Sequence, residues 1–419
     1  MEEVILGVIM NEMAMAVKNL GRNTKRTVLT LLTISVGLTA LMILGGYYEY
    51  NYWGLKESLI RSQLGHIQIY PEGYRKFRDS DPYNSALADL QGLTAFLENL
   101  PGVAVVSPHQ IFWGVVDAGP GGSSLVEVRG VLPEKENIIN TFFTYKSGRD
   151  LSVRDPLGAE IGKTLAQNLK LEPKADFYLS TITPQGEQNV LMLRTQGVIG
   201  SYSQDFDARI LRVPLETAKG LTGFSGVQEL IILLKDENRL AETMEAIRTK
   251  SAALGWNLEV TSWQDHAGYY LQVVEFYGGY FRIMLFIVTL VSFFSTFNAL
   301  LMAFFERITE VGTLRSFGAP NTSIARMMVL EGLVLGFAGT LGAYGFSGIL
   351  VLIITFMGGV PMPPPPGLTT SVSVMIRLSP GLFLLAGVIG LSVPLLASVF
   401  PIIKTLRMPI LDQIRFNER

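Results

Sequence analysis

The stretch ERITEVGTLRSFGAP, residues 306–320, lies between two long apolar runs at residues 281–305 and 327–360. A helix needs roughly 20 apolar residues to cross a bilayer, and each run reaches that length. The charged stretch between them is therefore predicted to be a short loop at one membrane face. Arg307 and Arg315 place this loop in the cytoplasm, because positively charged residues concentrate in cytoplasmic loops.

The loop has the sequence features of a short helix. Thr309 is predicted to cap its N-terminus, and Glu310 suits the first turn. Arg315 is expected near its end, where Gly318 provides a stop. A short polar helix held at the inner face by two spans can pass a push from a cytoplasmic partner into the membrane.

The same residues resemble the signature of FtsX-like permeases, which is roughly Glu-Arg-x-x-Glu-Ile-Gly-x-Leu-Arg-Ala-x-Gly-Ala. Val311 and Ser316 are mild departures from it. The resemblance implies that the loop is the coupling helix of an ABC transporter permease, docked on a separate ATPase subunit. Eight positions carry the match: Glu306, Arg307, Glu310, Gly312, Leu314, Arg315, Gly318 and Ala319.

An apolar face of this helix is predicted to contact the ATPase. Val311 and Leu314 share a face at helical spacing, with Phe317 as an apolar neighbour, and such a face can enter a groove on a partner. Glu310 and Arg315 are expected around it as polar contacts. The predicted coupling residues are Glu306, Arg307, Glu310, Val311, Gly312, Leu314, Arg315, Phe317, Gly318 and Ala319.

Composition indicates a few spans joined to a large water-exposed domain. The chain has 419 residues, of which 48% are hydrophobic and 17% charged, and its mean hydropathy is +0.33. A net charge of -2 gives no indication of nucleic-acid binding. The absence of cysteine excludes disulfides, thiolate metal sites and a thiol nucleophile.

The N-terminal region is predicted to lie along the inner membrane face and then cross the membrane. Residues 4–20 carry apolar side chains at helical spacing, which indicates an amphipathic helix. Lys18, Arg22, Lys25 and Arg26 form a cationic collar before the uncharged span at residues 27–48. An aromatic belt is expected at the far end of this span, at Tyr47, Tyr48, Tyr50 and Trp53.

The segment from residue 50 to about residue 278 contains no run able to span a membrane and is predicted to be one extracytoplasmic domain. A β-α-β pattern at each of its ends suggests a split ferredoxin-like lobe. The middle, residues 119–212, is expected to form a second, mostly β lobe. The strand-helix-strand ranges are 67–69, 87–100 and 103–106 at one end, and 230–234, 237–254 and 258–261 at the other.

The third predicted span is rich in glycine. Gly332 and Gly336 form a Gly-x-x-x-Gly motif, and Gly342 extends this small face, which allows another helix to approach closely in lipid. The face could pack within one subunit or against a second permease. The outside loop that follows has a proline run at residues 363–366, which favours a stiff polyproline segment.

Residues 158–164, GAEIGKT, nearly spell a phosphate-binding loop, but three residues separate the glycines where four are needed. A helix is predicted at residues 161–169 instead. No ATP is expected to bind this chain, so no cofactor is predicted and ATP is assigned to a partner subunit. No metal or catalytic site is predicted either, because His66, His109 and His266 are scattered in the sequence.

The predicted fold class is an α+β membrane protein with four transmembrane helices and a large extracytoplasmic α+β domain between the first and the second. Both ends of the chain are expected inside the cell. The predicted segments are an amphipathic helix at 1–23, spans at 24–49, 279–305, 327–357 and 381–403, a two-lobed periplasmic domain at 50–278, a coupling loop at 306–326, a proline-rich outer loop at 358–380 and a cytoplasmic tail at 404–419.

This arrangement resembles lipoprotein-releasing (Lol-type) permeases and is similar to MacB-type permeases. Residues 65–69, GHIQI, also resemble a Lol-type strand that follows the first span. The resemblance implies a non-enzymatic permease subunit of a mechanotransmission-type ABC transporter in the cell inner membrane. Such a subunit would relay ATP hydrolysis by a separate ATPase to the periplasmic domain, for lipoprotein release or export of an amphiphile.

The partners implied are a cytoplasmic ABC ATPase dimer, a second permease copy of the same or another kind, the lipid bilayer, and a periplasmic chaperone or adaptor. Nucleic acid is not among them. Two alternatives remain open from the sequence. One is an efflux permease of a tripartite pump, and the other is a non-transporting transmembrane regulator of a periplasmic hydrolase.

Overall fold

The computed structural model describes residues 24–143, 145–201, 203–362 and 372–416. The predicted amphipathic helix at residues 4–20, Lys18 and Arg22 of the cationic collar, and the proline run at 363–366 lie outside the described residues. The chain divides into two compact units, and each is described by itself. Among the described residues, the helix bundle comprises 24–52, 274–361 and 373–416, and the sheet domain comprises those within 53–273 together with Met362 and Val372.

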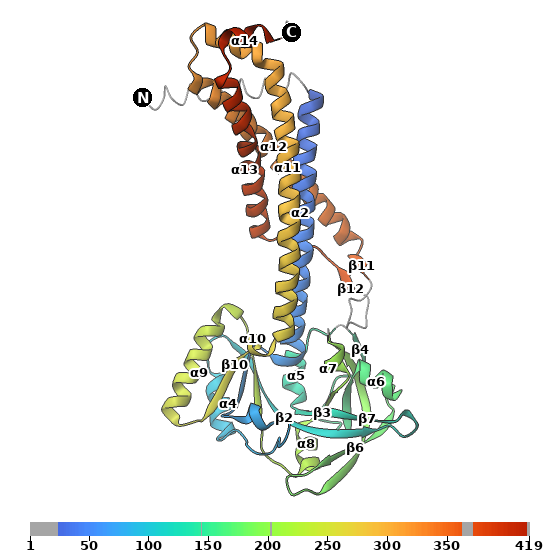
Figure 1. Cartoon of the computed structure of the whole chain (residues 1–419). Coiled ribbons are helices and arrows are strands. Elements are labelled where there is room, and N and C mark those ends of the chain that lie inside the picture. The colour runs from blue at the N-terminus through green and yellow to red at the C-terminus, as the bar shows by residue number, and fades with distance from the viewer. Residues whose placement is uncertain (1–23, 144, 202, 363–371, 417–419) are drawn as a thin grey trace. The chain divides into compact units, whose positions relative to one another are not determined.

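Four of the described helices are long and apolar enough to cross a membrane, and a sheet-rich domain lies between the first and the second along the chain. This confirms the predicted α+β fold class. The helices are coloured from blue to red in chain order in Figure 1. They are α2 (Thr24–Leu59), α11 (Gly268–Ser316), α12 (Asn321–Phe356) and α13 (Pro380–Arg407), followed by the short α14 (Ile410–Ile414).

Helix α11 is continuous through most of the predicted coupling loop, which corrects the prediction of a separate short helix. Thr309 lies inside α11 and therefore caps no N-terminus. A helix of 49 residues is about 74 Å long at 1.5 Å per residue, more than twice the hydrocarbon thickness of about 30 Å. The same helix can therefore both cross a membrane and extend well beyond it.

The predicted stop at Gly318 is confirmed. Gly318 has a φ of +89°, a conformation that glycine adopts without strain. The amide of Gly318 donates to the Arg315 carbonyl at 3.0 Å, and the amide of Ala319 donates to the Leu314 carbonyl at 3.0 Å. This bond pair is a Schellman motif, which closes the C-terminus of a helix.

The small face of α12 packs against other helices of the same chain. A Cβ added to Gly336 would lie 2.3 Å from the carbonyl oxygen of Gly390 on α13, and one added to Gly332 would lie 3.2 Å from the carbonyl oxygen of Pro394. One added to Gly342 would lie 2.4 Å from Oγ of Ser35 on α2. Both neighbours of this face are thus within the bundle, where the glycines allow the backbones to meet.

Helices α2 and α11 run side by side in the bundle (Figure 1). An aromatic cluster joins them, in which the Tyr48 ring lies 5.7 Å from that of Tyr277 and 5.9 Å from that of Phe281. Tyr52 stacks on Tyr48 at 6.2 Å. Tyr48 of the predicted aromatic belt is therefore also a packing residue between two helices.

The ends of the sheet domain form the predicted pair of β-α-β units. Their four strands are adjacent in the order β10-β1-β9-β2, and each neighbouring pair is antiparallel. This is the arrangement of a split ferredoxin-like lobe, and its core lies between the strands and two helices. The elements are β1 (Ile67–Pro71), α4 (Leu90–Glu98), β2 (Val103–Asp117), β9 (Glu229–Leu234), α9 (Leu240–Leu254) and β10 (Leu258–Ser262).

The insert between these units closes into a barrel. Strand β2 pairs with β3, and the ring continues through β8, β5, β7 and β6 back to β2. The second lobe is mostly β, as predicted, but the same sheet continues through both lobes, because β2 is long enough to belong to both. The barrel elements are β3 (Ser123–Val131), α5 (Pro133–Ile139), β5 (Gly158–Gly162), α6 (Lys163–Leu169), β6 (Asp176–Ile182), β7 (Gln188–Gly200), α7 (Gln204–Asp207), β8 (Ile210–Pro214) and α8 (Leu215–Thr222).

The near phosphate-binding stretch is a strand followed by a helix. Residues 158–162 form the buried strand β5, and α6 begins at Lys163, so the helix predicted from residue 161 begins two residues later. A Cβ on Gly162 would lie 2.2 Å from the carbonyl oxygen of Asp207. Gly162 is therefore needed for a close backbone contact within the barrel.

The remaining described elements are short. They are η1 (Ile60–Leu64), α3 (Tyr74–Phe77), η2 (Gly119–Gly121), β4 (Tyr145–Gly148), η3 (Glu237–Arg239), α10 (Trp263–His266), β11 (Val360–Met362) and β12 (Val372–Val374).

Candidate functional site

The C-terminal end of α11, which carries the signature, has an inward face that is covered by its own chain. Val311 is 5% exposed and packs in a core with Ile324 and Met328 of α12. A Cβ on Gly312 would lie 2.8 Å from Cβ of Gln413, so α14 passes directly over this glycine. Val311 and Leu314 were predicted to share one face that contacts the ATPase. For Val311 this prediction is wrong, because its side chain is already buried in the core of the bundle.

Two arginines of the signature also face inward. Arg315 Nη1 donates to the carbonyl oxygen of Met408, between α13 and α14, at 2.9 Å. Arg307 Nη1 lies 2.6 Å from Oε1 of Glu331 on α12, and the side chains of Arg307 and Glu331 are 15% and 5% exposed. Sequence reasoning missed Glu331. The available signal was that Glu331 is the single charged residue in the apolar run 327–360.

The opposite face of the α11 end is exposed. Leu314 is 45% and Phe317 85% exposed, and Glu306 and Glu310 are exposed as well. Their spacing, three or four residues apart, places them along one side of the helix. We call Glu306, Glu310, Leu314 and Phe317 the contact face, since it combines two apolar side chains with two carboxylates that a partner could bind.

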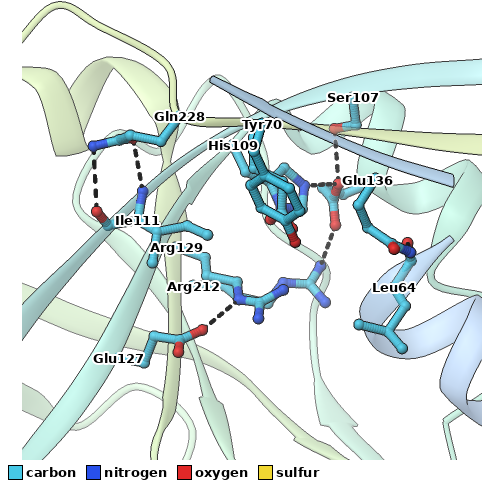
Figure 2. Close-up of polar contacts among 12 residues, drawn as sticks. Leu64, Tyr70, Ser107, His109, Ile111, Glu127, Arg129, Glu136, Arg212 and Gln228 are labelled. Carbon is cyan, nitrogen blue, oxygen red and sulfur yellow. Dashed lines mark hydrogen bonds and ion pairs between the residues drawn. The ribbon is translucent and has the colours of Figure 1, made fainter. Parts of the chain in front are cut away.

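A second cluster of functional groups lies in the sheet domain, at the strand position where the two lobes join. His109 of β2 lies opposite Glu229 of β9 on one side and opposite Val131 of β3 on the other. Its Nε2 is 2.7 Å from Oε1 of Glu136, and its Nδ1 is 3.4 Å from Oε2 of Glu229. Figure 2 shows His109 and Glu136 pointing toward one another.

This cluster continues into both lobes. Tyr70 Oη donates to Oε1 of Glu229 at 2.6 Å, on the ferredoxin-like side. Arg212 Nη2 lies 3.2 Å from Oε2 of Glu160 and 3.6 Å from Oε2 of Glu136, on the barrel side. All members are buried. Ser107 Oγ also donates to Oε1 of Glu136 at 2.8 Å. We define the buried polar network as Tyr70, Ser107, His109, Glu136, Glu160, Arg212 and Glu229.

The network favours the charged form of His109. Burial by itself lowers the pKa of His109, but Glu136 and Glu229 more than offset it, so the pKa of His109 is raised above its ordinary value. Burial by itself would raise the pKa of the Glu136 and Glu229 carboxyls. His109 and Arg212 instead lower the pKa of Glu136 to about 2, and His109 and Arg129 lower that of Glu229 to about 2.

An imidazolium between two carboxylates can fix the geometry of the joint between the lobes. Its burial keeps substrates away from the ring, so this arrangement indicates a structural joint and not a reaction centre. Sequence reasoning missed it because Glu136 is 27 residues from His109 along the chain and follows no local pattern. Among the described residues, no three histidine, cysteine or acidic side chains are grouped to hold a metal ion.

Comparison with known families decides what kind of chain carries these sites. Residues 282–410 match the model of the FtsX-like permease C-terminal region, and residues 27–250 match that of the MacB-like periplasmic core domain. The second match alone covers more than half of the 419 residues. The chain belongs to the FtsX-like permeases with a MacB-like periplasmic core domain. It is thus an ABC transporter permease, of a family whose members work with cytoplasmic ABC ATPases.

One relative is the lipoprotein-releasing system transmembrane protein LolC of Neisseria meningitidis serogroup B (strain ATCC BAA-335 / MC58). It is 23% identical over 332 residues, which cover 75% of this FtsX-like permease and 74% of LolC. Solved structures include the periplasmic region of MacB from Actinobacillus actinomycetemcomitans, with 13% identity and a TM-score of 0.36 over 51% of this chain and 94% of that one. The extracellular domain of YknZ from Gram-positive bacteria gives 13% identity and a TM-score of 0.34 over 47% and 100%.

In this FtsX-like permease the two sites belong to different matched regions. The contact face and Arg307 lie within the FtsX-like region at 282–410, whereas His109 and Glu229 lie within the MacB-like region at 27–250.

Proposed function

We propose that this chain is the membrane subunit of a mechanotransmission-type ABC transporter. A separate cytoplasmic ATPase dimer would bind the contact face, and its ATP-driven movement would be relayed along α11. The observation that carries this proposal is the continuity of α11, which runs without a break from Gly268, shortly after the last strand of the sheet domain, to Ser316 in the signature. The chain therefore runs as one continuous helix from the end of the sheet domain's sequence to the proposed ATPase site.

The contact face has the properties of a docking surface. An apolar anchor buried in a partner's pocket commonly contributes a few kcal/mol, about 2 or more, whereas charges around it mainly set orientation and rate. Leu314 and Phe317 supply the anchors, and Glu306 and Glu310 supply the charges. ATP would be bound by the partner, since residues 158–164 form a strand-to-helix turn in this chain.

The proposed location is the cell inner membrane, with the signature inside and the sheet domain in the periplasm. Arg307 and Arg315 support the inside assignment of the signature. A second permease copy would complete the assembly, because a two-fold ATPase dimer presents two equivalent sites. The second copy would be identical or a related chain.

The proposed cargo is a lipid-anchored protein, released from the membrane by movement of the sheet domain. The similarity to LolC over three quarters of the chain supports this cargo. Export of another amphiphile through a periplasmic adaptor is the second candidate, and the match to the MacB-like core domain favours it. A chaperone would receive the cargo in the first case and an adaptor in the second.

The test is copurification of the intact complex in mild detergent. The wild-type chain is expected to bring down an ABC ATPase, and Leu314→Asp is expected to lose it, because a charge cannot enter an apolar pocket without a large desolvation cost. Phe77→Asp is the matched control, since Phe77 is 52% exposed but lies on α3 of the sheet domain. Full ATPase binding by Leu314→Asp would show that this face is not the docking surface.

A further inference from the structure

Glu331 is an acidic residue on a helix that can span a membrane. It is ten residues after the start of α12, about 15 Å along the helix axis. Its side chain is 5% exposed. A buried ionised carboxylate on such a helix is costly unless a partner neutralises it, and residues of this kind commonly have a functional role.

An ion-pair partner of Glu331 comes from the signature itself. Arg307 Nη1 lies 2.6 Å from Oε1 of Glu331, and Arg307 Nε lies 4.0 Å from Oε2 of Glu310. Arg307 thus has a carboxylate of the contact face on one side and a buried carboxylate of the next helix on the other. The ion pair with Glu331 is much the shorter of the two, so Arg307 is held chiefly against α12.

Within one helical turn, some residues face outward, where a partner could bind, and Arg307 faces inward, toward the bundle. Glu306 and Glu310 are exposed, whereas Arg307 is largely covered, as are Ile308 and Val311 on its side of the helix. A residue covered by its own chain cannot serve mainly as a contact to another subunit. Arg307 must therefore affect a partner indirectly, through the helix α12 that it contacts at Glu331.

We propose that the ion pair between Arg307 and Glu331 is a positioning pair that makes α12 follow α11 when the contact face is displaced. This inference rests on the proposed function, in which an ATPase moves the end of α11. Apolar contacts between helices permit small sliding movements. A buried ion pair has few acceptable geometries, because separation would leave a charge without its partner in a low dielectric. Displacement at the signature is therefore shared by both helices.

The experiment uses single cysteines as reporters, which is direct because the chain has none of its own. Glu275→Cys reports on α11, and Phe356→Cys reports on the C-terminal end of α12, where Phe356 is 90% exposed. The rate of maleimide labelling is measured in the complex with copurified ATPase, without nucleotide and with ATP and vanadate. In the wild-type background both rates are expected to change with nucleotide.

Glu331→Gln keeps the shape of the side chain but removes its charge. The α11 reporter is expected to respond to nucleotide as before, and the α12 reporter is expected to lose its response. The swap Arg307→Glu with Glu331→Arg should restore the α12 response. Asp412→Asn, which removes an exposed acid from α14, is the control and should leave both responses intact.

Each other outcome is informative. A wild-type complex in which the ATPase copurifies but the α11 reporter does not respond would refute the proposed relay. An α12 response that persists in Glu331→Gln, or that the swap fails to restore, would refute the positioning pair alone. Failure of both Glu331→Gln and the swap to assemble would assign the pair to folding, and would overturn its role in transmission.

Discussion

At the scale of single residues, the structure explains why two charged groups that look ordinary in the sequence are special. His109 and Glu331 are each buried and each held by a side chain of opposite charge. A buried pair of this kind contributes little net stability when intact, but it leaves an uncompensated charge when one partner is removed. The most informative substitutions are therefore those that remove one member only.

Removal of the His109 charge is expected to destabilise the sheet domain. His109→Gln leaves Glu136 and Glu229 buried near each other without their shared cation, which should cost about 3–5 kcal/mol of unfolding free energy. All four tryptophans of the chain lie in the sheet domain, so tryptophan fluorescence during thermal unfolding of the full chain in detergent reports on that unit. Glu259→Gln, which removes the partly exposed pair with Arg75, is the control, at about 0–1 kcal/mol.

The cost of His109→Gln should depend on pH in a defined direction. The folded pKa of His109 is raised above the ordinary value of 6.5, so its stabilisation is complete below about pH 6.5 and is lost as the pH rises through the raised pKa. The difference in unfolding midpoint between wild type and His109→Gln should thus shrink toward alkaline pH. Asp207, whose pKa burial raises to about 6, titrates in both proteins and cancels in the difference. A difference that grows with pH would mean that His109 is neutral in the folded protein.

At the scale of elements, close helix packing depends on glycine at particular positions on α12. Gly336 faces the carbonyl oxygen of Gly390, and a Cβ would lie 2.3 Å from it, whereas a Cβ on Gly345 of the same helix would meet nothing within 4 Å. The two glycines have the same helix propensity cost but opposite packing environments. A comparison of alanine substitutions at these two positions therefore separates the effect of helix packing on stability from the effect of helix propensity.

Gly336→Ala is expected to destabilise the bundle, and Gly345→Ala is expected to be neutral or slightly stabilising. Overpacking against a backbone atom typically costs about 1–3 kcal/mol, because one helix must move away from the other. The measurement is the thermal midpoint of aggregation of the detergent-solubilised chain. Equal behaviour of the two variants would show that α12 and α13 do not approach each other as closely as Gly336 and Gly390 indicate.

At the scale of the whole molecule, the order of spans predicts which parts of the chain face which side of the membrane. Four helices of spanning length place the segment between the first and the second on one side and the signature, between the second and the third, on the other. From the positively charged residues around the signature we expect it in the cytoplasm. The sheet domain is then expected to lie outside the cytoplasm.

This topology can be tested in intact cells. A cysteine in place of Ser123, which is exposed in the sheet domain, should react with a membrane-impermeant maleimide in cells whose outer barrier is permeabilised. A cysteine in place of Ser316, which is exposed at the end of α11, should react only after the inner membrane is broken. The natural chain has no cysteine and serves as the blank. Reaction of the Ser316→Cys variant from outside would reverse the orientation.

The sequence by itself determined the four helices of spanning length, the strand-helix-strand order at both ends of the sheet domain, and the resemblance of residues 306–319 to a known signature. These are local properties, since the length of an apolar run, residue periodicity and short motifs each depend on residues that are close together in the sequence. The ferredoxin-like lobe could also be predicted, because each of its β-α-β units is continuous in sequence even though the barrel separates them.

Only the tertiary structure decided which side of each helix is covered, and by what. Periodicity gives α11 two faces at the signature, but it cannot show that Val311 meets α12 while Leu314 stays exposed. In the same way, only the structure shows that Glu331 pairs with Arg307 and that His109 lies between Glu136 and Glu229. Such pairs are set by the packing of segments distant in sequence, and their charges interact strongly because that packing excludes water.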